Sequence, residues 1–190
     1  MNYVKAGFQD RVPKLRGKIT HATVIREFIQ KCLERELALH TSRRVYEQIK
    51  NWRPLFRKEL LNEGIQREYV ERVLAVAEKK IKRFILENQG RVVVENALPT
   101  HRYEEVRRFF EKYEKDPRMI RVAKKKNRKS TLPEKSDMLI FSEALSFPSL
   151  YFVTTDDHFN VLTKEIEDEF SICLLTHDNI LQKMREWGWL

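Results

Sequence analysis

Apolar residues recur every three or four positions through most of the chain, which is the spacing of helices with one buried face. This spacing predicts helices at residues 3–8, 20–34, 42–52, 55–88 with a break at Gly64, 103–113, 137–145, 161–170 and 179–187. Short runs of β-branched and aromatic residues predict strands at 36–40, 91–95, 150–153 and 171–175, and the run at 150–153 is apolar enough to suggest a buried strand. Helices that alternate with strands in this order are typical of an α/β protein with a mainly parallel sheet.

Length and composition indicate one globular domain, residues 1–190. The chain has 190 residues and is 42% apolar, which is enough for a sizeable core. It has no apolar run near 18 residues and no signal-like segment, so we expect a soluble, cytoplasmic protein with no membrane partner. Cys32 and Cys173 lack the spacing of metal ligands, and we expect buried thiols.

Positive charge is in excess and is concentrated in one segment. Lys and Arg outnumber Asp and Glu by 37 to 28, which favours polyanionic partners, nucleic acid first. A basic loop is predicted at about residues 121–135, with its charges on Lys124, Lys125, Lys126, Arg128 and Lys129. The loop either contacts a phosphate backbone or is a solvated, flexible segment. Its position directly before an acidic residue, Asp137, favours the first interpretation.

Three aspartates form the candidate chemistry. Asp137 opens a predicted helix, and Asp156 and Asp157 follow the predicted strand at 150–153. Ligands of open α/β sheets bind beyond the carboxyl ends of such strands. Ionised carboxylates held together there need a cation, most simply Mg²⁺ or Mn²⁺. The alternative is that Asp137 only caps its helix and that Asp156 and Asp157 only form a turn, and the spacing alone does not decide between the two.

Several of these segments together resemble one protein family, the PIN-domain ribonucleases, which include many toxins of toxin–antitoxin modules. SDMLIFSEA resembles the family's Asp-x-x-Ile-x-x-x-Ala helix, FVTTDDHF its strand ending Val-Thr-x-Asp-x-x-Phe, LALHTSRRVYEQI its second strand and next helix, and CLLTHDNIL its last strand and helix. The resemblance covers residues 21–190, with a helical insertion at about 52–90. It implies a PIN-like three-layer sandwich with a mainly parallel central sheet.

The resemblance also implies a site. Glu47, Asp137 and Asp156 match the family's metal-binding acids, Thr154 its usual hydroxyl neighbour, and Asp157 is an extra carboxylate. His158 is not expected to act as a base, because strand alternation after Asp157 points it away from the metal. The family's first strand, which ends in a central Asp, has no match in residues 1–20. We expect that the sequence starts downstream of that strand; the alternative is a natural protein that has lost the residue and its activity.

The implied function is hydrolysis of RNA phosphodiester bonds with Mg²⁺ or Mn²⁺ as cofactor. Single-stranded RNA is the first expected partner, and a protein antitoxin and a second copy of the chain are the protein partners left open. Two other classes compete with the nuclease. One is a catalytically impaired PIN-like RNA-binding or ribonucleoprotein scaffold subunit, and the other is a helical DNA-binding protein.

Overall fold

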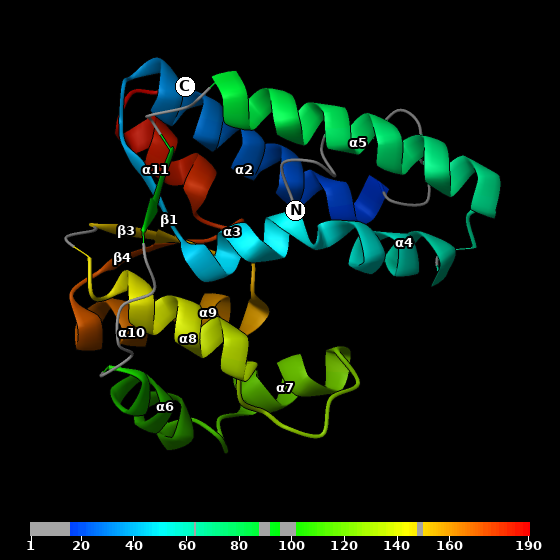
Figure 1. Ribbon diagram of the computed structural model, residues 1–190. Helices are drawn as coiled ribbons and strands as arrows, with labels where there is room; N and C mark the ends of the chain where they lie inside the picture. Colours follow the sequence, from blue (N-terminus) through cyan, green and yellow to red (C-terminus); the bar gives the residue numbers. More distant parts are fainter. Residues whose placement is uncertain (1–15, 63, 88–91, 96–101, 148–149) are drawn as a thin grey trace. The chain divides into compact units, whose positions relative to one another are not determined.

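The computed structural model describes residues 16–62, 64–87, 92–95, 102–147 and 150–190, with the elements labelled in Figure 1. The chain divides into two compact units. The first unit consists of Met1–Glu95 and Met184–Leu190, and the second unit consists of Asn96–Lys183. Each unit combines helices with a pair of strands, so the expected α/β class is confirmed. The helix predicted at 3–8 lies outside the described residues.

The described part of the first unit has helices and strands in the expected order, although the strand predicted at 36–40 is observed at Leu39–Ser42. Its elements are α2 (Arg16–Glu34), β1 (Leu39–Ser42), α3 (Arg43–Lys50), α4 (Trp52–Asn62), α5 (Arg67–Glu87) and β2 (Val92–Glu95). β1 and β2 pair in parallel, with Leu39 opposite Val92 and Ser42 opposite Glu95. The hydroxyl of Ser42 accepts a hydrogen bond from the backbone N–H of Val45 at 3.3 Å, which caps α3 as its sequence predicts.

Helices α4 and α5 form a hairpin with its own apolar core. The buried side chains from the two helices are Trp52, Phe56, Leu60, Val70, Val73, Leu74 and Ala77. Gly64, with φ +75°, lies in the turn between them. Pro54 is expected to interrupt a helix, and this expectation is wrong: α3 ends at Lys50, and Pro54 lies in the first turn of α4. The missing N–H of a proline has no intrahelical acceptor there, so the ring is tolerated.

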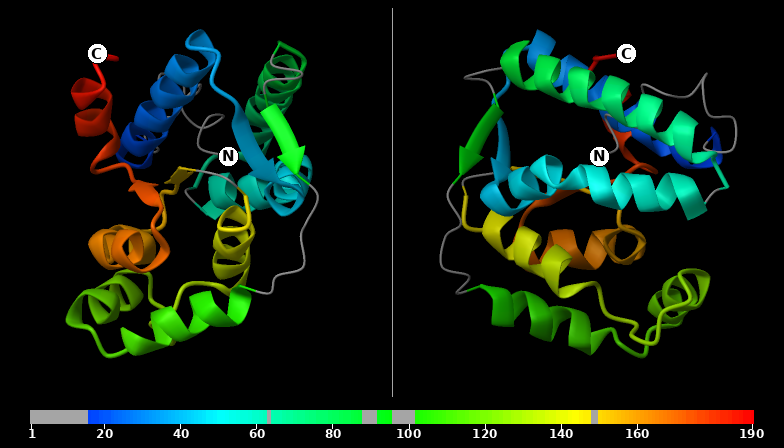
Figure 2. Two further views of the ribbon diagram at one scale, coloured as in Figure 1. Left: turned by 90° about the vertical axis from the view of Figure 1, so that its left-hand side faces the viewer. Right: turned by 45° about the vertical axis from the view of Figure 1, so that its right-hand side comes forward.

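The second unit holds most of the candidate site. Its elements are α6 (Tyr103–Lys112), α7 (Pro117–Lys125), α8 (Lys135–Ala144), β3 (Tyr151–Val153), α9 (Asp157–Val161), α10 (Thr163–Phe170) and β4 (Cys173–Leu175), and α11 (Ile180–Glu186) is divided between the two units. β3 and β4 pair in parallel with Tyr151 opposite Cys173. α6 packs along α8, as the views in Figure 2 also show.

An aromatic cluster forms the core of the second unit. Phe109, Phe110, Phe141, Phe159 and Phe170 are buried and contact one another through their rings. Phe159 is 1% exposed, and its ring meets those of Phe110 and Phe141 edge-on at centroid distances of 5.1 and 5.2 Å. This contact fixes α9, the helix that follows the acidic residues at the end of β3.

The structure corrects the expected basic loop at 121–135. Its first part is the end of α7, because Asp116 caps that helix and Pro117 occupies a first-turn position. The sequence predicts that Asp116 and Pro117 end the preceding helix, whereas they begin the next one. Met119, Val122 and Ala123 are the buried face of α7. The charged side chains at the start of the segment therefore project from a helix that is packed on its other face.

The strand at the site is less buried than expected. Leu150 is 75% exposed and Tyr151 is 46% exposed, although the apolar run suggests a buried strand. Within the described residues, β3 pairs with β4 alone, so one of its edges is not covered by a strand. The apolar run correctly predicts a strand here, but it does not predict how many strands pair with it.

Candidate functional site

The chain turns from β3 into α9 through a compact set of hydrogen bonds. The backbone N–H of Thr154 donates to the carbonyl of Leu175 at 2.9 Å and so extends the pairing of the two strands. The N–H of Asp156 donates to the Thr154 hydroxyl at 3.1 Å. Asp156 is the N-cap of α9 and accepts the N–H of His158 at 2.8 Å through Oδ1. Asp156 thus lies in the turn that the simpler interpretation assigns to it and also caps α9, and its second oxygen is left for other contacts.

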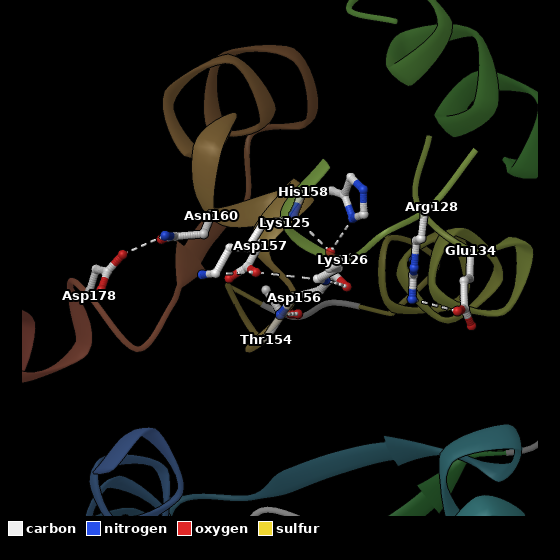
Figure 3. Close-up of polar contacts among 10 residues, drawn as sticks. All are labelled: Lys125, Lys126, Arg128, Glu134, Thr154, Asp156, Asp157, His158, Asn160 and Asp178. Carbon is white, nitrogen blue, oxygen red and sulfur yellow. Dashed lines mark hydrogen bonds and ion pairs between the residues drawn. The ribbon is translucent and has the colours of Figure 1, made fainter. Parts of the chain in front are cut away.

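Lys126 meets that second oxygen. Its Nζ lies 2.9 Å from Oδ2 of Asp156 and 3.9 Å from Oδ2 of Asp157. Lys125 lies 3.7 Å from the same Asp157 oxygen. Figure 3 shows both lysines beside the aspartates, which come from the start of α9. One cation therefore faces oxygens from both carboxylates.

His158 belongs to this cluster, although the sequence predicts no role for it. Its Nδ1 lies 2.8 Å from Oδ1 of Asp156, its side chain is fully buried, and its Nε2 has no hydrogen-bond partner among the described residues. The premise of strand alternation is wrong, because β3 ends at Val153 and His158 lies in the first turn of α9. An N-cap Asp followed two residues later by a His is the signal that could have found this contact.

The pKa values of two aspartates move in opposite directions. Burial would raise the pKa of Asp156, but hydrogen bonds from His158 and Lys126 outweigh it and hold that pKa well below its ordinary value. Burial raises the pKa of Asp137 to about 6, and the negative charges of Asp156 and Glu134 add to the rise. The charge of Asp156 thus contributes to the raised pKa of Asp137, after burial.

Asp137 is not the cap of its helix. α8 begins after Glu134, and Asp137 lies in the first turn of α8. Its backbone N–H donates to the carbonyl of Glu134 at 3.0 Å. The capping interpretation is therefore wrong for Asp137, whereas the turn expected at Asp156 is observed.

The remaining predicted residues divide between the two units. Glu47 is half-buried in α3 of the first unit, and its expected place beside Asp137 stays a prediction. Lys124 and Lys129 are exposed in the second unit. Arg128 donates to Glu134 at 2.6 Å. Of the five basic residues, Lys124, Lys125 and Lys129 are the most exposed and present their charge to solvent.

The donor set suits a hard cation. Carboxylate oxygens of Asp156 and Asp157 converge on one ammonium, and such oxygens are the ligands that Mg²⁺ and Mn²⁺ prefer. Mg²⁺ is often held by one or two carboxylates together with waters and substrate phosphates. Within the described ranges, no three His, Cys, Asp or Glu side chains group as potential metal ligands. The candidate donors observed together are therefore the carboxylates of Asp156 and Asp157.

Fold and site together define a mixed α/β protein with a charged cluster at the carboxyl end of a parallel strand pair. Comparisons of the chain with protein-family models, curated proteins and solved structures find no significant match. Among the helices that the structure describes, none is both long enough and apolar enough to cross a membrane.

Proposed function

We propose that this protein is a metal-dependent endoribonuclease of the PIN type that hydrolyses phosphodiester bonds in single-stranded RNA. The observation that carries the proposal is that Oδ2 of Asp156 and Oδ2 of Asp157 both face the ammonium of Lys126, at 2.9 and 3.9 Å, at the carboxyl end of β3. A three-layer sandwich with a mainly parallel sheet is part of this proposal. It is supported by two parallel strand pairs with helices between the strands in sequence.

Asp137 and Asp156 would hold the Mg²⁺ or Mn²⁺ ion, and the family resemblance alone implies Glu47 as a third ligand. When bound, such an ion lowers the pKa of a coordinated water and neutralises charge on the scissile phosphate. His158 orients Asp156 by binding its Oδ1, which leaves Oδ2 directed at the cation position. Thr154 fixes the backbone of Asp156, and Oδ2 of Asp157, which faces Lys126 together with Oδ2 of Asp156, would bind the ion directly or through a water.

RNA binding is assigned to the end of α7 and the loop that follows it. Lys124 and Lys125 occupy the last turn of α7, and Lys129 follows shortly after. All three side chains are exposed, and Lys125 is within 3.7 Å of an Asp157 oxygen. Positive charge adjacent to the carboxylates would hold the RNA backbone where the scissile phosphate needs to lie.

One observation favours a second candidate, an RNA-binding scaffold without catalysis. Lys126 already neutralises Asp156 at 2.9 Å, so part of the cluster is stable without a metal ion. A protein that had lost catalysis would retain such a pair as a structural contact, together with the exposed lysines that bind RNA.

The test is Mn²⁺-dependent cleavage of a labelled single-stranded RNA. We expect Asp137→Asn and Asp156→Asn each to lower the cleavage rate by at least about 100-fold, because each removes a metal-binding charge. Asp168→Asn, the same chemical change at an exposed position of α10, is the matched control and should cleave like the wild type. Equal cleavage by all four proteins rejects the site. RNA binding without cleavage by the wild type supports the scaffold.

A further inference from the structure

Lys126 is held at the acidic cluster more firmly than its neighbour. Its side chain is 25% exposed, whereas that of Lys125 is 77% exposed. Lys126 is also the C-cap of α7, and its N–H donates to the carbonyl of Val122 at 3.0 Å. Asn127 adopts a left-handed conformation with φ +51°, and Arg128 then donates its N–H back to Ala123 at 2.9 Å. These bonds fix the backbone, so only the side chain of Lys126 has freedom to move.

The ammonium of Lys126 and a divalent cation would use the same oxygens. Oδ2 of Asp156 and Oδ2 of Asp157 both face Nζ, and these are the atoms to which a hard cation would bind. Lys126 carries one charge, and the second ammonium at the pair, Lys125, lies 3.7 Å from Asp157 on a side chain that is 77% exposed and screened by solvent. A divalent ion can neutralise both carboxylates, so it has an electrostatic advantage over Lys126 once it is present. The four-carbon stem then allows the displaced ammonium to turn towards solvent without a change in the backbone.

We propose that Lys126 is a built-in counter-ion that a divalent cation displaces, and that the displaced ammonium then binds an RNA phosphate. Metal loading and RNA binding would thereby strengthen each other, because both favour the state in which Lys126 has left the carboxylates. The inference rests on the proposed function, since it concerns regulation of the same site. It gives Lys126 a different role from Lys124, Lys125 and Lys129, which contact RNA whether or not metal is bound.

The first test measures Mn²⁺ affinity of the whole chain by isothermal titration calorimetry, without RNA. Lys126→Met should tighten Mn²⁺ binding by about tenfold, within the usual range of coupling between sites. The matched control is Lys125→Met, which removes the same charge beside Asp157 and should change affinity by only about twofold because that lysine is exposed and screened. Equal effects of the two variants overturn the inference while the proposed nuclease stands. If Asp156→Asn binds Mn²⁺ as tightly as the wild type, the metal site itself is rejected, and the inference with it.

The second test needs no metal. Affinity for a single-stranded RNA oligonucleotide is measured by fluorescence anisotropy in EDTA for the wild type, Lys126→Met, Asp156→Asn and the double variant. Lys126→Met should weaken RNA binding by about twofold when Asp156 is present and pairs with the lysine. In the Asp156→Asn background the same substitution should weaken binding by about tenfold, which is the non-additivity expected of two residues in contact.

Lys126→Met should weaken RNA binding more in the Asp156→Asn background for a simple reason. The lysine there has lost its charged partner, so its full contribution to RNA binding becomes measurable. Asparagine is as good an N-cap as aspartate, so α9 should stay folded, which circular dichroism checks. If Lys126→Met weakens RNA binding by the same factor in both backgrounds, the proposed transfer of the ammonium from carboxylate to phosphate is overturned. If Lys126→Met weakens RNA binding more in the Asp156→Asn background, the proposed transfer is supported, whatever the cleavage assay shows.

Discussion

The two ends of α7 are both tied to the segment at residues 156–165, but by different kinds of ion pair. At the first end, Arg118 donates to Asp116 at 2.8 Å, to Glu165 at 2.6 Å and to the carbonyl of Val161 at 2.9 Å. At the other end, Lys126 donates to Asp156 at 2.9 Å. At the first end the planar guanidinium of Arg118 donates to three acceptors. At the second end the ammonium of Lys126 makes the ion pair.

Asp116 and Glu165 at the first end both have lowered pKa values, whereas the second end combines Asp156, whose pKa is lowered, with Asp137, whose pKa is raised. The side-chain hydrogen bond from Arg118 lowers the pKa of Asp116. Burial would raise the pKa of Glu165, but the bond from Arg118 outweighs it and lowers that pKa as well. At the second end, the pKa of Asp137 rises to about 6 because burial and the charge of Asp156 exceed what Lys126 and Arg128 offset. At the first end both acids are stabilised in their charged form, whereas at the second end Asp137 is not.

This difference separates a structural ion pair from a candidate site. A protein gains stability when acids are paired with bases, as at Arg118. Keeping a carboxyl with a raised pKa next to other carboxylates costs stability, and such arrangements occur most often where a ligand or a reaction uses the charge. The contrast therefore rests on Asp137 of α8, and it agrees with the role proposed for the residues near Lys126.

The largest expected effect comes from removing the aromatic anchor that the two ends share. Phe159 is 1% exposed and lies between Asp156 and Val161, the partners of Lys126 and Arg118. Phe159→Ala should lower the free energy of unfolding by about 3–5 kcal/mol, because it leaves a cavity among aromatic rings. Urea unfolding followed by circular dichroism measures the loss. Phe159→Leu, which fills part of the cavity, should cost clearly less, and equal losses would contradict the packing argument.

The next effect is a gain in stability at the second end. The pKa of Asp137 is about 6 in the folded protein and its ordinary value is 3.8, so between these pH values the folded state holds a proton that the unfolded state has released. Stability from this group therefore falls as pH rises from about 4 to 6 and stays low above that window. Asp137→Asn should raise the free energy of unfolding at pH 7.5 by about 1–3 kcal/mol, and the gain should vanish below about pH 4.

Asp116→Asn is the matched comparison, because its carboxyl has a lowered pKa. The stability that Asp116 contributes is present above its unfolded pKa and is lost as pH falls through the folded pKa, so this variant should be less stable than the wild type at pH 7.5. Urea unfolding of both variants across pH 3–8 measures the two trends. Trends of the same sign would remove the distinction between the two ends of α7.

Local sequence signals predict most of the elements and one part of the site. The periodicity places α2, α5 and α6, and a β-branched or aromatic run identifies each of β2 and β3. The acidic residues after β3 are predicted to lie at its carboxyl end, where Asp156 and Asp157 are observed. These signals are local, since each depends on a few consecutive residues and their spacing.

The contacts made through space are not predictable in the same way. The Asp116-Pro117 pair is compatible with the end of one helix and with the start of the next, and the buried Met119 shows which applies. Lys126 and Asp156 are 30 positions apart in the sequence, and no rule based on residue spacing predicts that they pair. Whether Glu47 joins Asp137 stays a prediction for the same reason, because it depends on how distant segments pack.

The smallest expected effect tests the shape of the cation at the first end. Arg118→Lys keeps the charge but cannot bond to Asp116, Glu165 and the Val161 carbonyl together, so the melting temperature should fall by about 2–4 °C. Arg121→Lys, at an exposed position of the same helix, controls for the substitution and should leave the melting temperature unchanged. Differential scanning calorimetry resolves this difference. If both variants have the melting temperature of the wild type, the planar guanidinium of Arg118 is not required for stability. The two ends of α7 are then more alike than their geometry indicates.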